Sequence, residues 1–207
     1  MNRIICISRE YGSGGHEIAE KAAGMLEIPC LDKQLMEQAI SLSGLPQELL
    51  KEAEEKLTNP FLYTSVYHGN RREFYGMSPG DIVFELEKRH IIEQANKGDC
   101  IIVGRCAEEV LKDSGHLVVN VFITAPLSYR VQRIQREFPN MIQKKLEALV
   151  RQKDKQRKAY YEYHTSKDWG VPYNYDVCLN SASIGTDRIV RLIAESFGKI
   201  TKEDEEK

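Results

Sequence analysis

Short apolar runs alternate along the chain with longer segments in which apolar residues recur every three or four positions. The short, β-branched run RIICIS at 3–8 has four consecutive apolar residues and leads into glycines, which is typical of a strand buried in a parallel sheet. HEIAEKAAGMLE at 16–27 then has the spacing of an amphipathic helix. The same reasoning predicts strands at 28–31, 100–104, 116–125 and 175–180, and helices at 32–44, 45–57, 79–97, 106–112, 126–137 and 185–197.

This alternation predicts an α/β fold of three layers, with a doubly wound parallel sheet of about five strands, because each parallel crossover needs a helix. One crossover is too long: roughly 68 residues separate the second strand from the third, where ~10–12 suffice. We therefore expect a single domain over 1–207, with a helical lobe inserted at about 32–97, a lid segment at about 139–170 and a frayed tail at 200–207.

Composition excludes several classes of partner. The 29 basic and 31 acidic side chains leave a formal net charge of −2, so neither a nucleic acid nor a membrane surface is expected. The five cysteines form no CxxC pair, which favours free thiols in a reducing cytoplasm over a metal site or disulfides. No apolar run reaches the length of a secretion signal or a membrane span, so we expect a cytoplasmic protein.

The segment REYGSGGHEIA at 9–19 joins the first strand to the first helix. Glycines let backbone amides approach an anion, and the helix start adds a positive end, so the segment suits a phosphate. The pattern GxxxxGK[ST] is not met, because His16 replaces the lysine and Glu17 and Ile18 offer no hydroxyl for Mg²⁺. A turn that only packs helix on strand, and a dinucleotide-binding turn with Asp32 as the ribose acid, remain open at this point.

Basic residues gather after the third and fourth predicted strands. Arg105 could hold a substrate phosphate or carboxylate in a bidentate fork, or could pair with Glu108 or Glu109 at the surface. The second group is best explained as a mobile lid that closes over phosphates, with a solvated helix face as the alternative. Its members are Arg130, Arg133, Arg136, Lys144, Lys145, Arg151, Lys153, Lys155, Arg157 and Lys158.

With these pieces in place, the chain resembles the cytidylate kinase-like family, relatives of the nucleoside monophosphate kinases with a P-loop kinase-like fold. The resemblance runs over nearly the whole chain. It rests on the segments ISREYGSGGHEIAEKAA, IPCLDKQLM, IIVGRCAEEVL, VFITAPLSYRVQR, RQKDKQRKAYYEYHTSKDWG and NYDVCLN.

The resemblance implies a role for each matching position. The donor ATP would bind the loop and the end of the fifth strand, at Gly12, Ser13, Gly14, Gly15, His16, Glu17, Asn180 and Ser181. Catalysis would involve His16, Arg130, Arg133, Arg151 and Arg157. The acceptor would bind Asp32, Lys33, Arg105 and Asp154, although Cys106 stands where the GRD motif of cytidylate kinases has its aspartate. No residue is assigned as a metal ligand.

The sequence therefore predicts ATP-dependent phosphoryl transfer, with Mg²⁺, to a small acidic acceptor such as a nucleoside monophosphate, for example CMP. One alternative is a nucleotide- or anion-binding regulatory module with weak catalysis, which His16 would explain. A second alternative is a dinucleotide-dependent enzyme, although the basic lid would have no task there. The sequence leaves the oligomeric state open, and a homo-oligomer is compatible with it.

Overall fold

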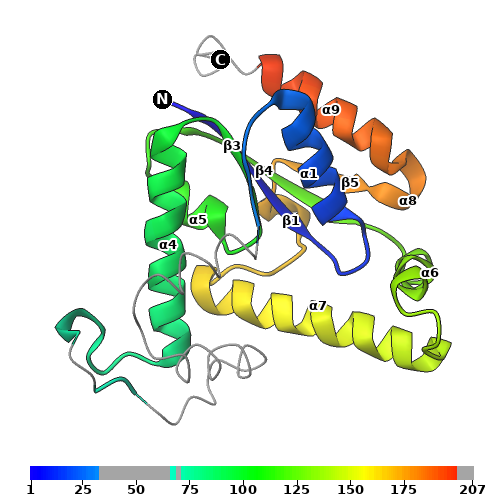
Figure 1. Cartoon of the computed structure of the whole chain (residues 1–207), viewed down its shortest axis with the longest axis horizontal. Helices are drawn as coiled ribbons and strands as arrows, with labels where there is room; N and C mark the ends of the chain where they lie inside the picture. Colours follow the sequence, from blue (N-terminus) through cyan, green and yellow to red (C-terminus); the bar gives the residue numbers. More distant parts are fainter. Residues whose placement is uncertain (33–65, 69–70, 200–207) are drawn as a thin grey trace.

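Five parallel strands form the sheet of the computed structural model, which describes residues 1–32, 66–68 and 71–199 (Figure 1). Their order is β2-β3-β1-β4-β5, so β3 lies between β1 and β2. Dinucleotide-binding sheets follow the order 3-2-1-4-5 instead, which argues against the dinucleotide alternative. The strands are β1 (Arg3–Arg9), β2 (Cys30–Leu31), β3 (Cys100–Val103), β4 (Leu117–Thr124) and β5 (Val177–Asn180).

The side chains of β1 alternate between two cores, one on each face of the sheet. Ile5 and Ile7 pack with α1 and α9, whereas Ile4 and Cys6 pack with α4 and α5. Helices thus cover both faces, and the prediction of a three-layer, doubly wound α/β fold is confirmed. These helices are α1 (Gly15–Leu26), α4 (Pro79–Lys97), α5 (Ala107–Leu111) and α9 (Thr186–Lys199).

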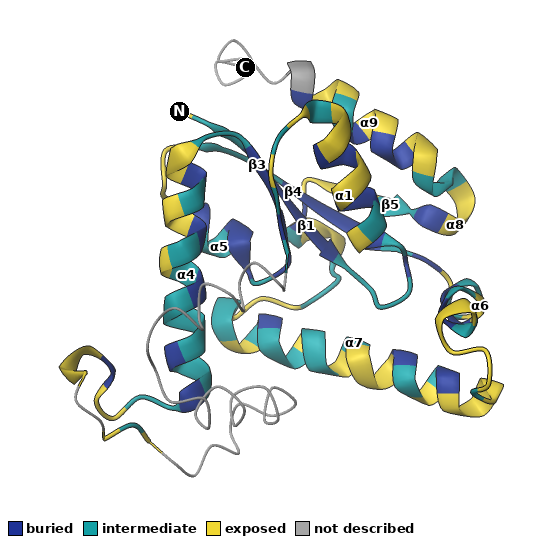
Figure 2. Ribbon diagram, viewed as in Figure 1, coloured by how far each residue is buried: buried dark blue, intermediate teal, exposed yellow. Residues whose placement is uncertain are grey.

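Helix α7 (Gln143–Thr165) crosses the molecule beyond the carboxyl ends of the strands (Figure 1). Its buried Leu146 and Val150 pack on Val131 and Ile134 of α6 (Leu127–Glu137), which fixes its first half. Figure 2 shows that the strands near the middle of the sheet are buried, whereas α7 is mostly intermediate or exposed. In an open α/β sheet this is the edge where ligands bind, so α7 covers the expected site.

The predicted strands and helices that fall on described residues are present, with changed bounds. The second strand shrinks to Cys30–Leu31, and the charged stretch left without an assignment is the single helix α7. A 3₁₀ turn, η2 (Arg72–Phe74), lies in the segment predicted as irregular, and η3 (Pro172–Asn174) and the short helix α8 (Ser181–Ile184) flank β5. The predicted helices at 32–44 and 45–57 and the tail at 200–207 lie outside the described residues, apart from Asp32.

Across residues 1–32, 66–68 and 71–199, no helix combines the length and the apolar character needed to cross a bilayer.

Candidate functional site

The glycine loop between β1 and α1 has the backbone of an anion cradle. Gly12 and Gly14 have φ of +80° and +86°, in the left-handed region that favours glycine. A Cβ on Gly12 would lie 2.9 Å from the backbone oxygen of Arg130, and one on Gly14 would lie 3.2 Å from Cζ of Arg133. No side chain of the described residues caps α1, which begins at Gly15, so the amides of its first turn are open to an anion.

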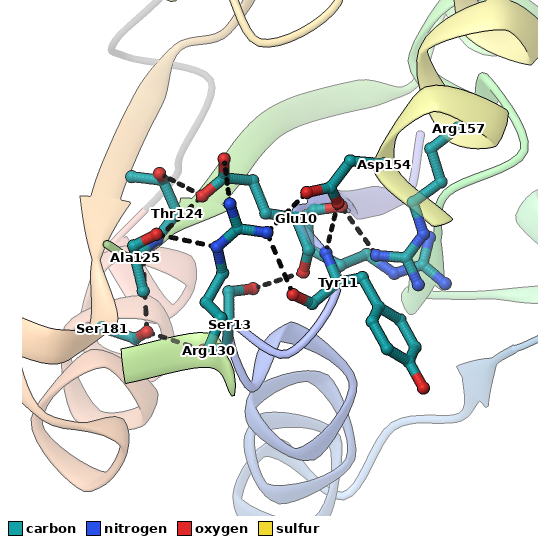
Figure 3. A network of polar contacts seen from close by, with 10 residues as sticks. Glu10, Tyr11, Ser13, Thr124, Ala125, Arg130, Asp154, Arg157 and Ser181 are labelled. Carbon is teal, nitrogen blue, oxygen red and sulfur yellow. Dashed lines mark hydrogen bonds and ion pairs between the residues drawn. The ribbon is translucent and has the colours of Figure 1, made fainter. Parts of the chain in front are cut away.

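Arg130 braces this loop from α6 (Figure 3). Its Nε donates to the carbonyl of Ala125 at 2.9 Å, and its Nη1 donates to the carbonyl of Tyr11 at 3.1 Å and to the carboxylate of Asp154 at 2.5 Å. Its Nη2 lies 3.3 Å from the carboxylate of Glu10. Protein groups therefore engage every guanidinium nitrogen of this buried side chain. Through these contacts Arg130 stabilises the loop backbone at Tyr11. Its predicted role at the donor phosphates stays a prediction.

Hydrogen bonds from other elements hold the loop backbone in place. Asp154 of α7 accepts from the amide of Tyr11 at 2.7 Å, and the hydroxyl of Ser181 donates to the carbonyl of Ser13 at 2.6 Å. Asn180 caps α8 by accepting from the amides of its first turn. The residues predicted at the end of β5 thus lie beside the glycine loop.

The first turn of α1 carries an ion-pair network. The carboxylate of Glu17 pairs with Arg133 and with Lys21, the latter at 2.8 Å. Hydrogen bonds from Lys21 and Arg133 lower the pKa of Glu17, so the group is ionised at neutral pH. Because Lys21 and Arg133 flank this carboxylate, their positive charges offset its repulsion of an anion bound at the start of the helix.

His16 occupies the position where a P-loop has its lysine. The imidazole is about half exposed, and its Nε2 lies 3.5 Å from Glu20 and 3.9 Å from Asp32. A neutral ring can donate one hydrogen bond to a phosphate, while a protonated ring would also carry charge. Asp32, which we predict to bind the acceptor, therefore lies next to His16 of the glycine loop.

A cleft of about 570 Å³ opens beside the loop, where β1 and β3 end. None of the lining residues that the structure describes is acidic. Four of them are basic and four are aromatic, so the cleft suits an anionic ligand with a flat or apolar body. These eight are Arg9, Arg105, Lys153, Arg157, Tyr11, Tyr160, Tyr161 and Trp169.

Arg105 stands at a sharp turn after β3 and is held by a buried pair. Arg105 and Cys106 have φ of +61° and +53°, which non-glycine residues adopt at a cost. Nη1 of Arg105 lies 3.1 Å from the carboxylate of Glu87, which is 1% exposed and also accepts from the hydroxyl of Tyr160 at 2.7 Å. Burial and Glu87 raise the pKa of Tyr160 well above its usual value, so the hydroxyl stays a donor. The turn and the ion pair with Glu87 therefore hold the side chain of Arg105 in the wall of the cleft.

The predicted site residues separate into two neighbouring groups. One group forms or surrounds the glycine loop: residues 12–17, Asn180, Ser181, Arg130 and Arg133. The other group, Arg105 and Arg157, lines the cleft. Arg151 is exposed on α7 and lines neither, and Lys33 lies outside the described residues. No group of three or more His, Cys, Asp or Glu side chains that could hold a metal ion occurs among the described residues.

The sequence reasoning missed Arg9, Glu10, Glu87 and Tyr160. Arg9 ends β1, as Arg105 follows β3, so the rule that selected Arg105 would also have selected Arg9. Glu10 takes the place of the first glycine of the P-loop pattern, and that pattern gives it no role. Glu87 and Tyr160 carry no local signal, because their pairing joins α4 to α7 across 73 positions.

Comparisons with known proteins agree with the fold and with the resemblance. The model of the cytidylate kinase-like family matches residues 4–183. No protein with a curated description matches the chain. Among solved structures, an uncharacterized protein from Eubacterium ventriosum ATCC 27560 is 24% identical with a TM-score of 0.71, and the match covers 96% of this chain and 100% of that one.

Two other solved structures share the fold at lower identity. Shikimate kinase from Bacteroides thetaiotaomicron is 14% identical with a TM-score of 0.53, over 95% of this chain and 98% of that one. A sugar kinase from Janibacter sp. HTCC2649 is 13% identical with a TM-score of 0.51, over 93% of each chain.

Proposed function

Because the chain belongs to the cytidylate kinase-like family, we propose that it transfers the γ-phosphoryl group of ATP to a small acidic acceptor, with a nucleoside monophosphate such as CMP as the first candidate. One observation carries the proposal: the anion cradle at Gly12 to His16 lies directly beside a cationic cleft, because Tyr11, the residue before Gly12, lines that cleft. Phosphoryl transfer from ATP to an acidic acceptor needs two anionic reactants held side by side in water-excluding surroundings, so two adjoining anion sites suit this reaction.

The residues present fit the phosphates of ATP, the phosphoryl donor. The left-handed Gly12 and Gly14 and the uncapped start of α1 offer backbone amides, and Arg133 lies against Gly14. His16 would donate one hydrogen bond from the lysine position. The cleft would hold the acceptor through Arg105 and its cationic neighbours and orient it toward the loop.

The residues present fit Mg²⁺ poorly. The hydroxyl that would hold it after the lysine position is absent, and Glu17 is engaged by two cations. Magnesium in phosphoryl-transfer sites is often held mainly by phosphates and water, and this protein would depend on that mode. We assign no step of the reaction to a protein-bound metal.

The alternative is a module that binds nucleotide without turnover, and His16 is the observation that favours it. Losing a full charge at this position costs on the order of 10²–10³ in rate, the scale of one preorganised donor. Buried free thiols such as Cys6 and Cys100 agree with the reducing cytoplasmic setting that we propose for either function.

Calorimetry with ATP, followed by an assay of ADP release with Mg²⁺ and a panel of monophosphates, tests the proposal. A kinase binds ATP and releases ADP faster when the right acceptor is added, and His16→Lys should raise that rate about 10²-fold. Binding without ADP release, unchanged in H16K, would favour the sensor. Absence of ATP binding by the unaltered protein would contradict both.

A further inference from the structure

We propose that Glu20, together with Asp32, makes His16 a proton-dependent ligand of the donor's phosphates, so that ATP binds the glycine loop together with one proton from solution. The inference rests on the proposed function and deepens it, because it names what regulates the donor site. Glu20 acts through His16 and is therefore a positioning residue. Neither the glycine-loop pattern nor the family resemblance gives Glu20 a task.

The imidazole of His16 turns one particular nitrogen toward two carboxylates. His16 and Glu20 lie four positions apart on α1 and so share a face of the helix, and Asp32 directly follows β2. Nε2 of His16 lies 3.5 Å from a carboxylate oxygen of Glu20 and 3.9 Å from one of Asp32. Both contacts are longer than a hydrogen bond, but two negative groups favour a hydrogen over a lone pair on the nitrogen that faces them. These neighbours therefore place the hydrogen of the neutral ring on Nε2.

This placement decides which form of His16 can bind a phosphate. A neutral imidazole has one N–H and one lone pair, so a hydrogen on Nε2 leaves Nδ1 as an acceptor. A phosphate oxygen is also an acceptor and gains nothing from that nitrogen. A second proton, taken from water, turns Nδ1 into a donor and gives the ring a positive charge. The imidazolium is thus the form that binds the phosphates while Nε2 still faces Glu20 and Asp32.

Charged groups from α1, α6 and the ends of β1 and β2 lie around the first turns of α1. They are Glu17, Glu20, Lys21, Arg133, Arg9 and Asp32. Lys21 and Arg133 offset Glu17. Burial and two neighbouring arginines lower the pKa of Arg9 well below its usual value, and attraction from Asp32 opposes that shift. Glu20 forms no ion pair with a lysine or arginine among residues 1–32, 66–68 and 71–199. A phosphate bound next to a neutral His16 therefore adds negative charge near Glu20 without a new cation, and protonation of the ring supplies one.

Exposure assigns the proton to the complex with ATP. The side chains of His16 and Glu20 are 51% and 60% exposed, so water screens their attraction when the loop is empty. Bound phosphates add their charge to that of the two carboxylates and exclude water from the ring.

Coupling of this kind gives the donor affinity a defined dependence on pH. Histidine changes its charge between about pH 5 and pH 8, whereas a lysine stays charged throughout that range. If binding takes up one proton, affinity falls as pH rises, by up to about tenfold per pH unit once the ring of the unbound protein is neutral. His16 thus replaces a constant phosphate ligand by one that responds to pH.

Calorimetry of ATP binding near pH 8, in two buffers of different ionisation enthalpy, counts the protons taken up. The unaltered protein should take up about one proton per ATP more than His16→Lys, because the lysine is already charged before ATP binds. Its affinity for ATP, relative to that of H16K at the same pH, should fall by about five- to tenfold from pH 7 to pH 8. The comparison with H16K cancels the titration of ATP itself. Equal proton uptake by the two proteins would overturn the inference.

Glu20→Gln tests the positioning role with the same measurement. Nε2 of His16 then faces one carboxylate instead of two, so a neutral ring can turn its N–H to the phosphates, and the excess proton uptake should fall by about half. The matched control Glu27→Gln removes an exposed carboxylate at the other end of α1 and should keep the full uptake. Full uptake in E20Q would overturn the task given to Glu20. An equal loss in E27Q would also overturn it, since the effect would then be one of net charge.

Inorganic tripolyphosphate as a second probe separates this inference from the proposed function. It offers the phosphates of a donor without the base and the sugar. Excess proton uptake with tripolyphosphate, in a protein that does not bind ATP, would contradict the proposed function and support the inference. Binding of ATP without excess uptake would overturn the inference and leave the proposed function standing. Binding of neither ligand would contradict both.

Discussion

Arg130 and Arg9 both lie against the glycine loop, at Gly12 and at Gly15, and show two uses of the same side chain. Every nitrogen of Arg130 meets a carbonyl or a carboxylate of the protein, whereas Arg9 and its neighbour Arg157 have no ion pair among the described residues. A saturated arginine stabilises the fold, and an unsaturated one in a cleft is available to a ligand. Local sequence does not distinguish them, because both lie near the carboxyl ends of strands of the same sheet, Arg9 at the end of β1 and Arg130 in the helix after β4.

The largest expected effect comes from Arg130→Met. Removing this guanidinium leaves the carboxylates of Glu10 and Asp154 without their shared cation, so we expect a loss of about 3–5 kcal/mol in the free energy of unfolding. Urea unfolding measures it, with R9Q as the comparison that should lose no stability. A loss below about 1 kcal/mol in R130M would show that Arg130 is not the brace we describe.

Gly12→Ala tests the loop that Arg130 supports. A Cβ there would lie 2.9 Å from a backbone oxygen of α6 at a φ of +80°, so we expect a loss of about 2–4 kcal/mol and a loss of ATP binding. Gly24→Ala is the matched control, because nothing lies within 4 Å of its added Cβ inside α1. That variant should gain about 0.5–1 kcal/mol. Similar behaviour of the two variants in urea would contradict the assigned geometry.

Tyr160→Phe tests whether the position of Arg105 in the cleft depends on its ion pair with Glu87. The hydroxyl of Tyr160 donates to the buried Glu87 that holds Arg105, so its removal should cost about 1–3 kcal/mol of stability. In the kinase assay it should raise the KM of the acceptor more than it lowers kcat. An unchanged KM with lower stability would mean that the pair serves the fold alone.

The smallest expected effect concerns two adjacent glutamates of α5 and their dependence on pH. Burial raises the pKa of Glu108, so its contribution to stability is fully present below the ordinary carboxyl pKa and is lost as pH rises through the folded value. Glu108→Gln should therefore gain stability relative to the unaltered protein between about pH 4 and about pH 7, by roughly 1 kcal/mol or less.

Its neighbour Glu109 should behave in the opposite way. Burial opposes ionisation of Glu109, but hydrogen bonds with Lys112 and Lys167 outweigh it and lower the pKa. Stability from this group is present above the ordinary carboxyl pKa and is lost as pH falls through the folded value. Glu109→Gln should thus be at its greatest disadvantage near neutral pH. Urea midpoints at both pH values measure the two variants, and equal signs would contradict the opposite assignments.

Periodicity predicted the sheet well because parallel strands are buried on both faces. Residues 4–7 in RIICIS and 100–103 in CIIVG are apolar at four consecutive positions and buried, so these strands could be recognised without knowledge of their partners. The glycine loop could be predicted for a related reason, since its backbone conformation depends on residues adjacent in sequence. Periodicity does not indicate helix α7, because its buried apolar residues, Leu146, Val150 and Tyr161, are sparse among charges.

The task of each arginine could not be predicted from the sequence. Spacing placed Arg105 and Arg130 after strands, but the partners that distinguish them come from α4, α7 and the loop, far away along the chain. Arg9 was overlooked because it reads as the end of a strand. Its surroundings depend on the absence of side chains at Gly15 and Gly104, which a list of residue types does not reveal.

The hydrogen bonds between α7 and the glycine loop can form only late in the synthesis of the chain. Asp154 accepts from the amide of Tyr11 across 143 positions, and Arg157 donates to the carbonyl of Arg9 across 148. Both bonds form only after the ribosome has released most of the chain, although the loop itself is among the first segments to emerge. In a nascent chain the glycine loop therefore emerges long before α7 can hold its backbone in the conformation described above. We expect nucleotide binding to begin only once α7 has emerged.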